Sequence, residues 1–321
     1  MTGRELDRRA FSGLALAAAF AAPRVRADPA TGTRLPSDED VYEPPTSLAL
    51  VADMYARMTA PLQIDGRGPF PFVVDTGANQ SVISSELAVR LSLPQGAPSA
   101  LNGVAGVEMA PTTAAALGLG RRARRETTLF VLPQSAIGGD GMLGLDGLDG
   151  QTLVLDFKRR ALEIEAGGRR GLESRTVVLR ARRRDGQLTL VDAELAGIPV
   201  TAFIDSGAQN TIGNKALQRL AALRQPTSSW TVAPIVSVTG QTIEGDLADL
   251  PHLRIGGLSL PRWRVAFADL HTFRLWDLTE RPAILIGVDI LSRFEKVTLD
   301  FARNEVSFRV PDMGNVREMH T

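Results

Sequence analysis

Residues 72–84 read FVVDTGANQSVIS, an apolar run that ends at Asp75 and then turns at a glycine. Residues 203–214 read FIDSGAQNTIGN and repeat the same arrangement around Asp205. Short apolar runs that end in glycine-bearing turns are typical of buried strands. A carboxylate is costly to bury without partners. The two stretches therefore predict core strands that bring both acids to one shared, hydrated interface.

The rest of the chain repeats around these acids. Three landmarks recur in the same order: a hairpin before each acid (residues 64–75 and 195–205), an apolar-apolar-glycine triplet (MLG at 142–144 and LIG at 285–287) and the sequence LDF (155–157 and 299–301). Between them, β-branched and apolar segments alternate with glycine and proline turns, and helical periodicity is confined to short segments. Such an internal repeat predicts two copies of one unit. We therefore expect an all-β duplication.

The repeat also sets the expected domain boundaries. The chain has 321 residues, and 44% apolar content is enough for two modest cores. We expect a first lobe at residues 47–168 and a second at 169–312. An irregular linker is expected at 28–46, which is rich in Pro, Thr, Ser and Asp, and a tail at 313–321.

Residues 1–27 resemble a twin-arginine export signal. Arg8 and Arg9 precede a mild apolar run at 14–22, and residues 25–27 offer a cleavage site. The apolar run is shorter than the roughly 20 residues that cross a bilayer. We therefore expect export to the bacterial periplasm, with no stable membrane span after signal removal. Retention of this segment as an anchor is the alternative.

Composition excludes several classes of function. The 36 basic residues balance 36 acidic ones without a broad basic field, so no nucleic-acid partner is expected. Cysteine is absent, which excludes disulfides and thiolate nucleophiles. The three histidines are scattered, and no G-x-S-x-G elbow is present, so neither a metal site nor serine chemistry is expected. No cofactor is implied.

The two acid-bearing stretches resemble the aspartic peptidases. Alanine follows both D-T-G and D-S-G, as in the retropepsin-like branch rather than the pepsin branch, and the resemblance covers nearly all of the chain after Thr46. It implies an all-β acid-protease fold of two tandem retropepsin-like closed-barrel lobes related by a pseudo-twofold axis. In this family the apolar-apolar-glycine strand covers the acid-bearing loop. Gly144 and Gly287 are expected to do so here.

The resemblance implies that Asp75 and Asp205 form a catalytic dyad. Two carboxyls a few ångströms apart cannot both ionise comfortably, so the pair shares one proton. One acid then deprotonates a water that attacks the scissile carbonyl, while the other protonates the carbonyl oxygen. This chemistry needs neither a metal nor a cofactor.

The neighbours of the acids have expected tasks. Gly77 and Gly207 permit a tight turn and let the two loops approach without a Cβ clash. Thr76 and Ser206 can place hydroxyls across the interface onto the backbone of the opposite loop. These four residues should fix the separation of the acids.

Ala78 and Ala208 stand where pepsin-like members usually carry a hydroxyl that stabilises the charged carboxylate. Loss of that donor should raise the pKa values of the dyad. We therefore expect activity at mildly acidic to neutral pH.

An extended polypeptide substrate is expected to bind between the lobes as an added β-strand, under flap hairpins. By position, the flaps are residues 101–113, with Gly103 and Gly106, and residues 236–245, with Gly240. The alternative for each segment is an ordinary surface hairpin.

Four further acids recur in the repeat and are expected to be structural. Asp146 and Asp289 follow the apolar-apolar-glycine triplets, and Asp156 and Asp300 lie in the LDF sequences at strand entries.

The sequence thus predicts an aspartic endopeptidase that acts on exported proteins or on ectodomains of membrane proteins. We expect a monomer, an intramolecular pseudo-dimer whose two lobes replace two subunits. A catalytically weak peptide-binding or scaffolding protein on the same fold is one alternative. Pairing of like lobes between two chains is another.

Overall fold

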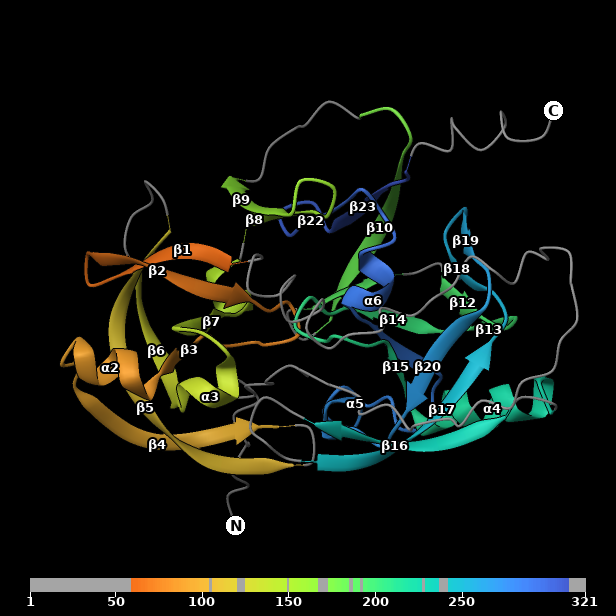
Figure 1. Ribbon diagram of the computed structural model, residues 1–321, viewed down its shortest axis with the longest axis horizontal. Coiled ribbons are helices and arrows are strands. Elements are labelled where there is room, and N and C mark those ends of the chain that lie inside the picture. Colours follow the sequence, from red (N-terminus) through yellow and green to blue (C-terminus); the bar gives the residue numbers. More distant parts are fainter. Residues whose placement is uncertain are drawn as a thin grey trace, which may run out of the picture.

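The computed structural model describes residues 59–103, 106–119, 125–148, 150–166, 173–184, 187–190, 193–226, 229–236 and 242–311. The export signal, the linker, the tail and Gly240 lie outside these residues. The described chain is mostly β-strand, so the predicted all-β duplication is confirmed (Figure 1). In the described part of the chain, no helix is both long and apolar enough to cross a bilayer.

The first repeat forms a seven-stranded barrel. Its strands are β1 (Thr59–Ile64), β2 (Arg67–Val74), β3 (Val82–Ser84), β4 (Gln95–Asn102), β5 (Val107–Leu119), β6 (Arg125–Leu132) and β7 (Gly141–Leu143). They follow the order β1-β2-β7-β3-β6-β5-β4, and pairing of β1 with β5 closes the sheet. All three residues of β7 are buried, as is the apolar end of β2. The acid therefore follows a strand from the centre of the barrel.

The second repeat forms a matching set of strands. These are β11 (Gln187–Leu190), β12 (Ala193–Leu195), β13 (Ile198–Pro199), β14 (Thr201–Ile204), β15 (Ile212–Gly213), β16 (Trp230–Val236), β17 (Thr242–Leu250), β18 (Leu253–Ile255), β19 (Leu258–Leu260), β20 (Trp263–Phe267) and β21 (Ala283–Ile286). A turn at His252, whose φ is 51°, separates β17 from β18. Because β12 pairs with β18, this lobe closes in a small four-stranded sheet of its own.

The helices are short and occupy matching places in the two lobes. They are α2 (Ser85–Arg90), α3 (Gln134–Ile137) and the 3-10 turn η1 (Leu145–Gly147) in the first lobe, and α4 (Lys215–Arg224), α5 (His271–Leu275) and α6 (Val288–Leu291) in the second. Ser84 caps α2 by accepting a hydrogen bond from the amide of Leu87, and Asn214 caps α4 by accepting one from Leu217.

The strands nearest the acids cross in the same way in both lobes. In the first lobe β7 lies between β2, to which it is parallel, and β3, to which it is antiparallel. In the second lobe β21 lies between β14 and β15 with the same two orientations. The sequence similarity of the repeats thus extends to their topology.

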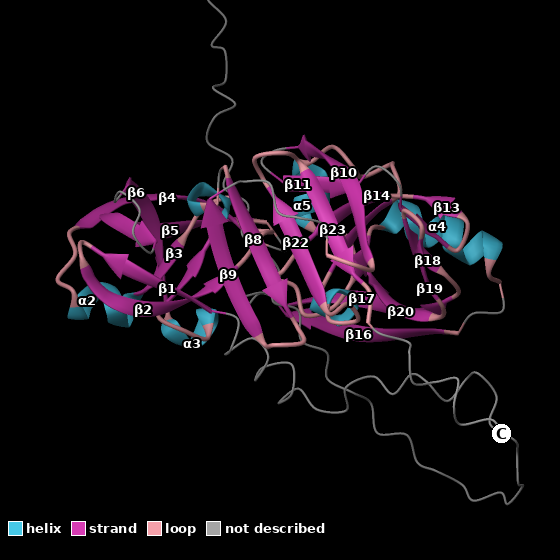
Figure 2. Ribbon diagram, turned by 90° about the horizontal axis from the view of Figure 1, so that it is seen from above, coloured by secondary structure: helices cyan, strands magenta, loops and turns pink. Residues whose placement is uncertain are grey.

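A shared sheet joins the lobes. Its strands are β8 (Gln151–Asp156), β9 (Ala161–Ala166), β10 (Thr176–Arg184), β22 (Lys296–Asp300) and β23 (Glu305–Arg309), in the order β10-β23-β22-β8-β9. Figure 2 shows them side by side between the two barrels. Val154 and Thr298 each precede an LDF sequence and are therefore equivalent in the two repeats, and they pair with each other. On either side of them, Asp156 pairs with Lys296 and Asp300 pairs with Thr152. A pseudo-twofold axis therefore passes through the Val154–Thr298 pair.

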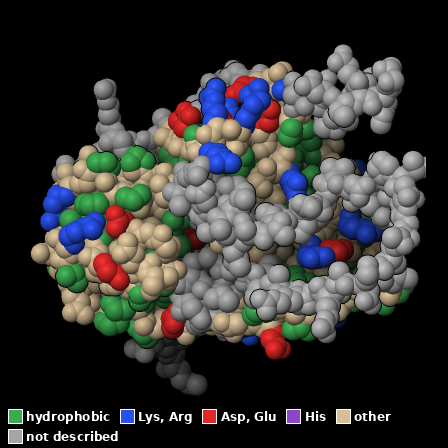
Figure 3. Space-filling model, in the orientation of Figure 1, with side chains coloured by type: hydrophobic (Ala, Val, Ile, Leu, Met, Phe, Trp, Pro, Cys, Tyr) green, Lys and Arg blue, Asp and Glu red, His purple; other side chains and the backbone are tan. Residues whose placement is uncertain are grey.

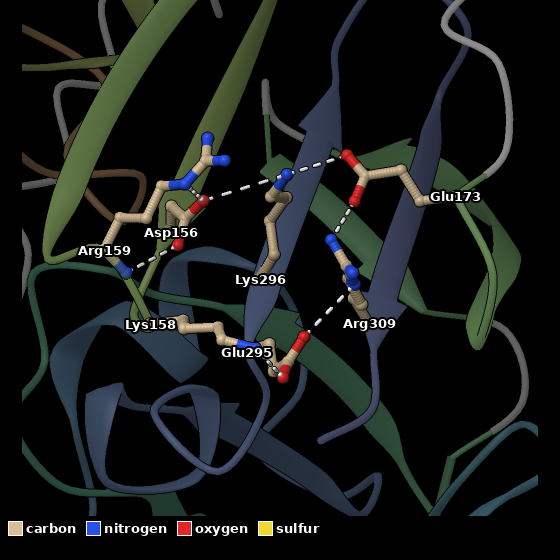
Figure 4. Close-up of polar contacts among 7 residues, drawn as sticks. All are labelled: Asp156, Lys158, Arg159, Glu173, Glu295, Lys296 and Arg309. Carbon is tan, nitrogen blue, oxygen red and sulfur yellow. Dashed lines mark hydrogen bonds and ion pairs between the residues drawn. The ribbon is translucent and has the colours of Figure 1, made fainter. Parts of the chain in front are cut away.

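Ion pairs reinforce this shared sheet (Figure 4). Lys158 Nζ lies 2.6 Å from Glu295 Oε1, and Lys296 Nζ lies 3.7 Å from Asp156 Oδ2, so both pairs join the two repeats. Glu173 links Lys296, at 2.8 Å, to Arg309. Charged side chains of both signs gather over this part of the surface (Figure 3).

Candidate active site

The two acids follow the central strands β2 and β14 and meet at the lobe interface. Asp75 is fully buried and Asp205 is 2% exposed. A Cβ built on Gly77 would lie 2.6 Å from the carboxyl carbon of Asp205, and one built on Gly207 would lie 2.2 Å from that of Asp75. Each carboxyl group is therefore seated against the glycine of the opposite loop, an approach that no larger residue permits.

Thr76 and Ser206 lock the two loops together. Thr76 Oγ1 donates to the carbonyl of Ile204 at 2.9 Å and accepts from the amide of Ser206 at 2.9 Å. Ser206 Oγ donates to the carbonyl of Val74 at 3.0 Å and accepts from the amide of Thr76 at 3.1 Å. The four bonds are buried and reciprocal. They hold the ends of β2 and β14 in register across the interface.

Backbone amides orient both carboxyl groups. Asp75 Oδ1 accepts from the amides of Gly77, at 2.8 Å, and Ala78, at 3.2 Å. Asp205 Oδ1 accepts from Gly207, at 2.9 Å, and Ala208, at 3.1 Å. In each residue one oxygen is held by its own loop, which leaves the other oxygen for the partner acid or a substrate.

Burial dominates the electrostatics of the pair. It raises the pKa of Asp75 well above the ordinary value, and the neighbouring charge of Asp205 raises it further, against the lowering effect of the loop amides. Burial also raises the pKa of Asp205, to about 7. Asp75 Oδ2 is buried and receives no hydrogen bond from any described donor. A proton shared with Asp205 would supply one, so the pair retains a proton to near-neutral pH.

The glycines of the apolar-apolar-glycine triplets pack directly on the acid-bearing loops. A Cβ on Gly144 would lie 2.8 Å from the carbonyl oxygen of Gln80, and one on Gly287 would lie 2.7 Å from that of Asn210. The amides just after these glycines, in Leu145 and Val288, donate to the carbonyls of Ala78 and Ala208 at 2.8 Å each. The triplet strands thus cover both loops.

Two half-buried acids, Asp146 and Asp289, tie these covering strands to the loops. Ser81 donates to Asp146 at 2.6 Å and accepts from the amide of Gly144. Thr211 donates to Asp289 at 2.8 Å and accepts from Gly287. The repeat placed each hydroxyl at the same offset from its acid, but sequence reasoning did not pair these residues with Asp146 and Asp289.

Ala78 and Ala208 are fully buried in two small apolar clusters. Leu101 and Met142 share the cluster of Ala78, and Ile235 shares that of Ala208. A hydroxyl at either position would face apolar side chains, which accounts for alanine in both loops. Neither alanine side chain can donate a hydrogen bond to its acid.

Two hairpins lie where the flaps were expected. One is β4–β5 and the other is β16–β17, and Figure 1 shows both along its lower edge, running toward the middle of the molecule. The amide of Gly103 donates to the carbonyl of Gly106 at 2.7 Å at the end of the first hairpin. Gly240 belongs to the part of the second hairpin that the structure does not describe.

The first hairpin also touches the opposite lobe, a contact that the sequence did not predict. Asn102 Oδ1 lies 3.1 Å from Nε2 of His271, at the start of α5. Burial and the nearby Arg274 lower the pKa of His271. Another residue missed from the sequence is Gln187, whose side chain reaches the loop of Asp75. Neither His271 nor Gln187 belongs to a repeated motif, so the sequence carries no signal that would reveal these two contacts.

The described residues contain no group of three or more His, Cys, Asp or Glu side chains arranged to hold a metal ion. The arrangement at the lobe interface is a pair of buried carboxyl groups, both with raised pKa values. Such a pair can act as a general acid and a general base at the same time.

Comparison with known proteins matches each half of the chain separately. A family model described as "gag-polyprotein putative aspartyl protease" matches residues 60–149, and one described as "aspartyl protease" matches residues 191–290. Each range contains one acid of the pair. Among solved structures, the chain is similar to a retropepsin-like aspartic protease from Rickettsia conorii, with 18% identity, 42% of this chain and 89% of that chain covered, and a TM-score of 0.28. No curated protein matches the chain significantly.

Proposed function

We propose that this chain, which belongs to the retropepsin-like aspartic peptidases through two tandem family domains, is an endopeptidase whose catalytic pair is Asp75 and Asp205. The single observation that carries the proposal is the seating of each carboxyl group against the glycine of the opposite loop. Two acids so close, both with raised pKa values, are suited to hold one proton jointly.

The chemistry follows from the shared proton. The ionised carboxylate takes a proton from a water molecule, whose oxygen attacks the carbonyl carbon of the peptide bond. The protonated carboxyl gives its proton to the carbonyl oxygen, which yields a tetrahedral diol. The dyad then takes a proton back from one hydroxyl and delivers a proton to the amide nitrogen, and the C–N bond breaks. The products are an acid and an amine, and the pair again holds one proton.

The proposed substrate is a polypeptide bound in an extended conformation between the lobes. The β4–β5 and β16–β17 hairpins are suited to cover it, since a flap that closes over a substrate excludes water and completes the site. Because residues 1–27 resemble an export signal, the proposed location is the bacterial periplasm and the proposed substrates are exported proteins or ectodomains. One chain supplies both acids, so the proposed active form is a monomer.

Cleavage of a peptide library tests the proposal. Asp75→Asn and Asp205→Asn should each abolish cleavage and keep the fold, because asparagine has nearly the same shape but cannot exchange the proton. Asp300→Asn is a matched control, since the carboxyl of Asp300 accepts hydrogen bonds from the amides of Ala302 and Arg303 in a turn. That variant should retain cleavage.

Two results would contradict the proposal. Full turnover by either dyad variant would remove the acids from the mechanism. Peptide binding by the wild type without any cleavage product would instead favour the catalytically weak binding or scaffolding protein.

A further inference from the structure

Gln187 is a buried residue of the second lobe that reaches the acid-bearing loop of the first. It begins β11, which pairs with β14, the strand that leads to Asp205. The side chain is 1% exposed. Its Nε2 donates to the carbonyl of Gly77 at 3.0 Å and to Oδ1 of Asn79 at 3.2 Å. One carboxamide thus connects the framework of Asp205 to the loop of Asp75.

The first of these bonds acts on a peptide group that touches the dyad. The carbonyl of Gly77 and the amide of Ala78 belong to the same planar peptide unit and point in opposite directions. The amide of Ala78 donates to Asp75 Oδ1 at 3.2 Å. Because the unit is rigid, a donor that holds the carbonyl also fixes the direction of the N–H toward the carboxyl group.

This peptide unit has a defined electrostatic effect. Its N–H favours the charged form of Asp75 and so opposes the rise in pKa that burial causes. If the unit turned away, Asp75 would hold its proton more tightly. The orientation of the unit therefore influences the pH range over which the dyad carries one proton.

We propose that Gln187 is a positioning residue: by holding the Gly77–Ala78 peptide unit, it aims the Ala78 N–H at Asp75 and couples the proton affinity of the dyad to the docking of the two lobes. The role in turnover rests on the proposed peptidase function. The effect on proton affinity does not, because it requires only the folded protein.

A space-filling role alone is a weak account of this residue. Methionine would fill a similar volume without a buried polar group, and burial of an amide is favourable only when its hydrogen bonds are made. Gln187 makes both of its described side-chain bonds to the loop that carries Asp75. The carboxamide is therefore matched to that loop.

The experiment compares Gln187→Met and Gln187→Glu with the wild type. Methionine keeps the size and removes the donors, and ionised glutamate places an acceptor against the carbonyl of Gly77. Gln218→Met is the matched control. Gln218 lies on α4, and its side-chain amide also donates a hydrogen bond, in this case to Asp246. Two properties are measured: the carboxyl titration of the dyad by NMR with aspartate labelled at the side-chain carboxyl carbon, and the pH profiles of kcat and KM on a cleaved peptide.

We expect the apparent pKa for loss of the last proton of the dyad to rise by about half a unit to one unit in both variants. The alkaline limb of kcat/KM should move by the same amount. The value of kcat should fall about tenfold with little change in KM, because misaligned catalytic groups affect the transition state more than binding. Gln218→Met should match the wild type in the apparent pKa of the dyad, in the alkaline limb of kcat/KM and in kcat.

The results separate the two claims. A shifted titration in a protein that cleaves no peptide would support the positioning role and reject the peptidase function. An active Gln187→Met variant with the titration and kcat of the wild type would overturn the positioning role. If Gln187→Met does not fold, Gln187→Glu provides the test. Its protonated side chain keeps one donor for the carbonyl of Gly77, and the dyad can be titrated as the glutamate ionises and loses that donor.

Discussion

The amide of Ser206 donates to the hydroxyl of Thr76 at 2.9 Å, and the amide of Thr76 donates to the hydroxyl of Ser206 at 3.1 Å. Each hydroxyl also donates to a carbonyl of the opposite strand end. All four of these bonds cross from one lobe to the other. The separation of the acids is therefore set by an exchange of bonds between lobes, which makes the lobe interface part of the candidate active site.

Thr76→Val should destabilise the protein by about 2 kcal/mol, because it removes a buried acceptor from the amide of Ser206 and a buried donor from the carbonyl of Ile204. Chemical denaturation measures the loss. A double-mutant cycle with Ser206→Ala should give a coupling of at least about 0.5 kcal/mol. Strict additivity of the two substitutions would show that the hydroxyls do not act as a pair.

Gly207→Ala should abolish activity and destabilise the fold by about 1 to 3 kcal/mol, because the added methyl group would overlap the carboxyl of Asp75. Activity assays and thermal unfolding check both effects. Gly257→Ala is the matched control, since a Cβ there meets nothing within 4 Å. Wild-type activity in Gly207→Ala would mean that the two acid-bearing loops lie farther apart in solution than they do in the structure.

The dyad should make the folded protein less stable as pH rises from about 4 to about 7. Burial raises the pKa of Asp205 from 3.8 to about 7, so the native state binds more protons than the unfolded state in this window. Stability falls with pH wherever the native state binds more protons. Carboxyls with pKa values lowered from 3.8, such as Asp246 and Asp249, have the opposite effect and at lower pH, since the stability they add is lost as pH falls below that value. The difference between wild type and Asp205→Asn reports the contribution of Asp205 together with its effect on the pKa of Asp75.

Melting temperatures measured at several pH values test this expectation. Asp205→Asn should gain stability relative to wild type as pH approaches 7. A gain confined to pH values below 4 would contradict the sign. For catalysis, the same raised pKa values predict an optimum at mildly acidic to neutral pH, and an optimum near pH 3 would be inconsistent with them.

His271→Ala should loosen the first hairpin by removing its side-chain partner for Asn102. We expect KM to rise about threefold to tenfold with kcat within about twofold of wild type, because a weakened flap contact lowers the affinity for substrate in both the ground and transition states. Hydrogen exchange in β4 and β5 should accelerate. His252→Asn, in the turn between β17 and β18, is the control. If that variant raised KM and hydrogen exchange as much as His271→Ala does, the Asn102–His271 contact would not be the cause.

The sequence predicted the parts of the site that belong to the repeated motifs, including the hydroxyls of Thr76 and Ser206 that cross the lobe interface. Asp75 and Asp205 follow apolar strands, and the glycines Gly144 and Gly287 come from a motif that occurs twice, so local pattern and repetition were sufficient. Gln187 and His271 act on residues of the other lobe and belong to no repeated motif. Their partners depend on how the lobes dock, which strand periodicity does not encode.

The shared sheet shows the same limit. The LDF sequences were expected to open two closing strands, but Asp156 and Asp300 are the last residues of β8 and β22. The pairing of these two strands with each other follows from the twofold relation between the lobes rather than from either sequence alone. The ion pairs of Lys158 with Glu295 and of Lys296 with Asp156 arise from that pairing. Charged residues in a single sequence do not reveal partners so far along the chain.

The Val154–Thr298 pair has a consequence for how the site assembles. The two halves that meet there are parts of one chain, so their association is a first-order event with a high effective concentration. A site built from two separate subunits comes apart when the protein is diluted, whereas this one should retain constant specific activity down to the lowest concentrations at which turnover is measurable. The covalent link also allows each half to change by itself, so that one lobe can diverge without an identical change in the other.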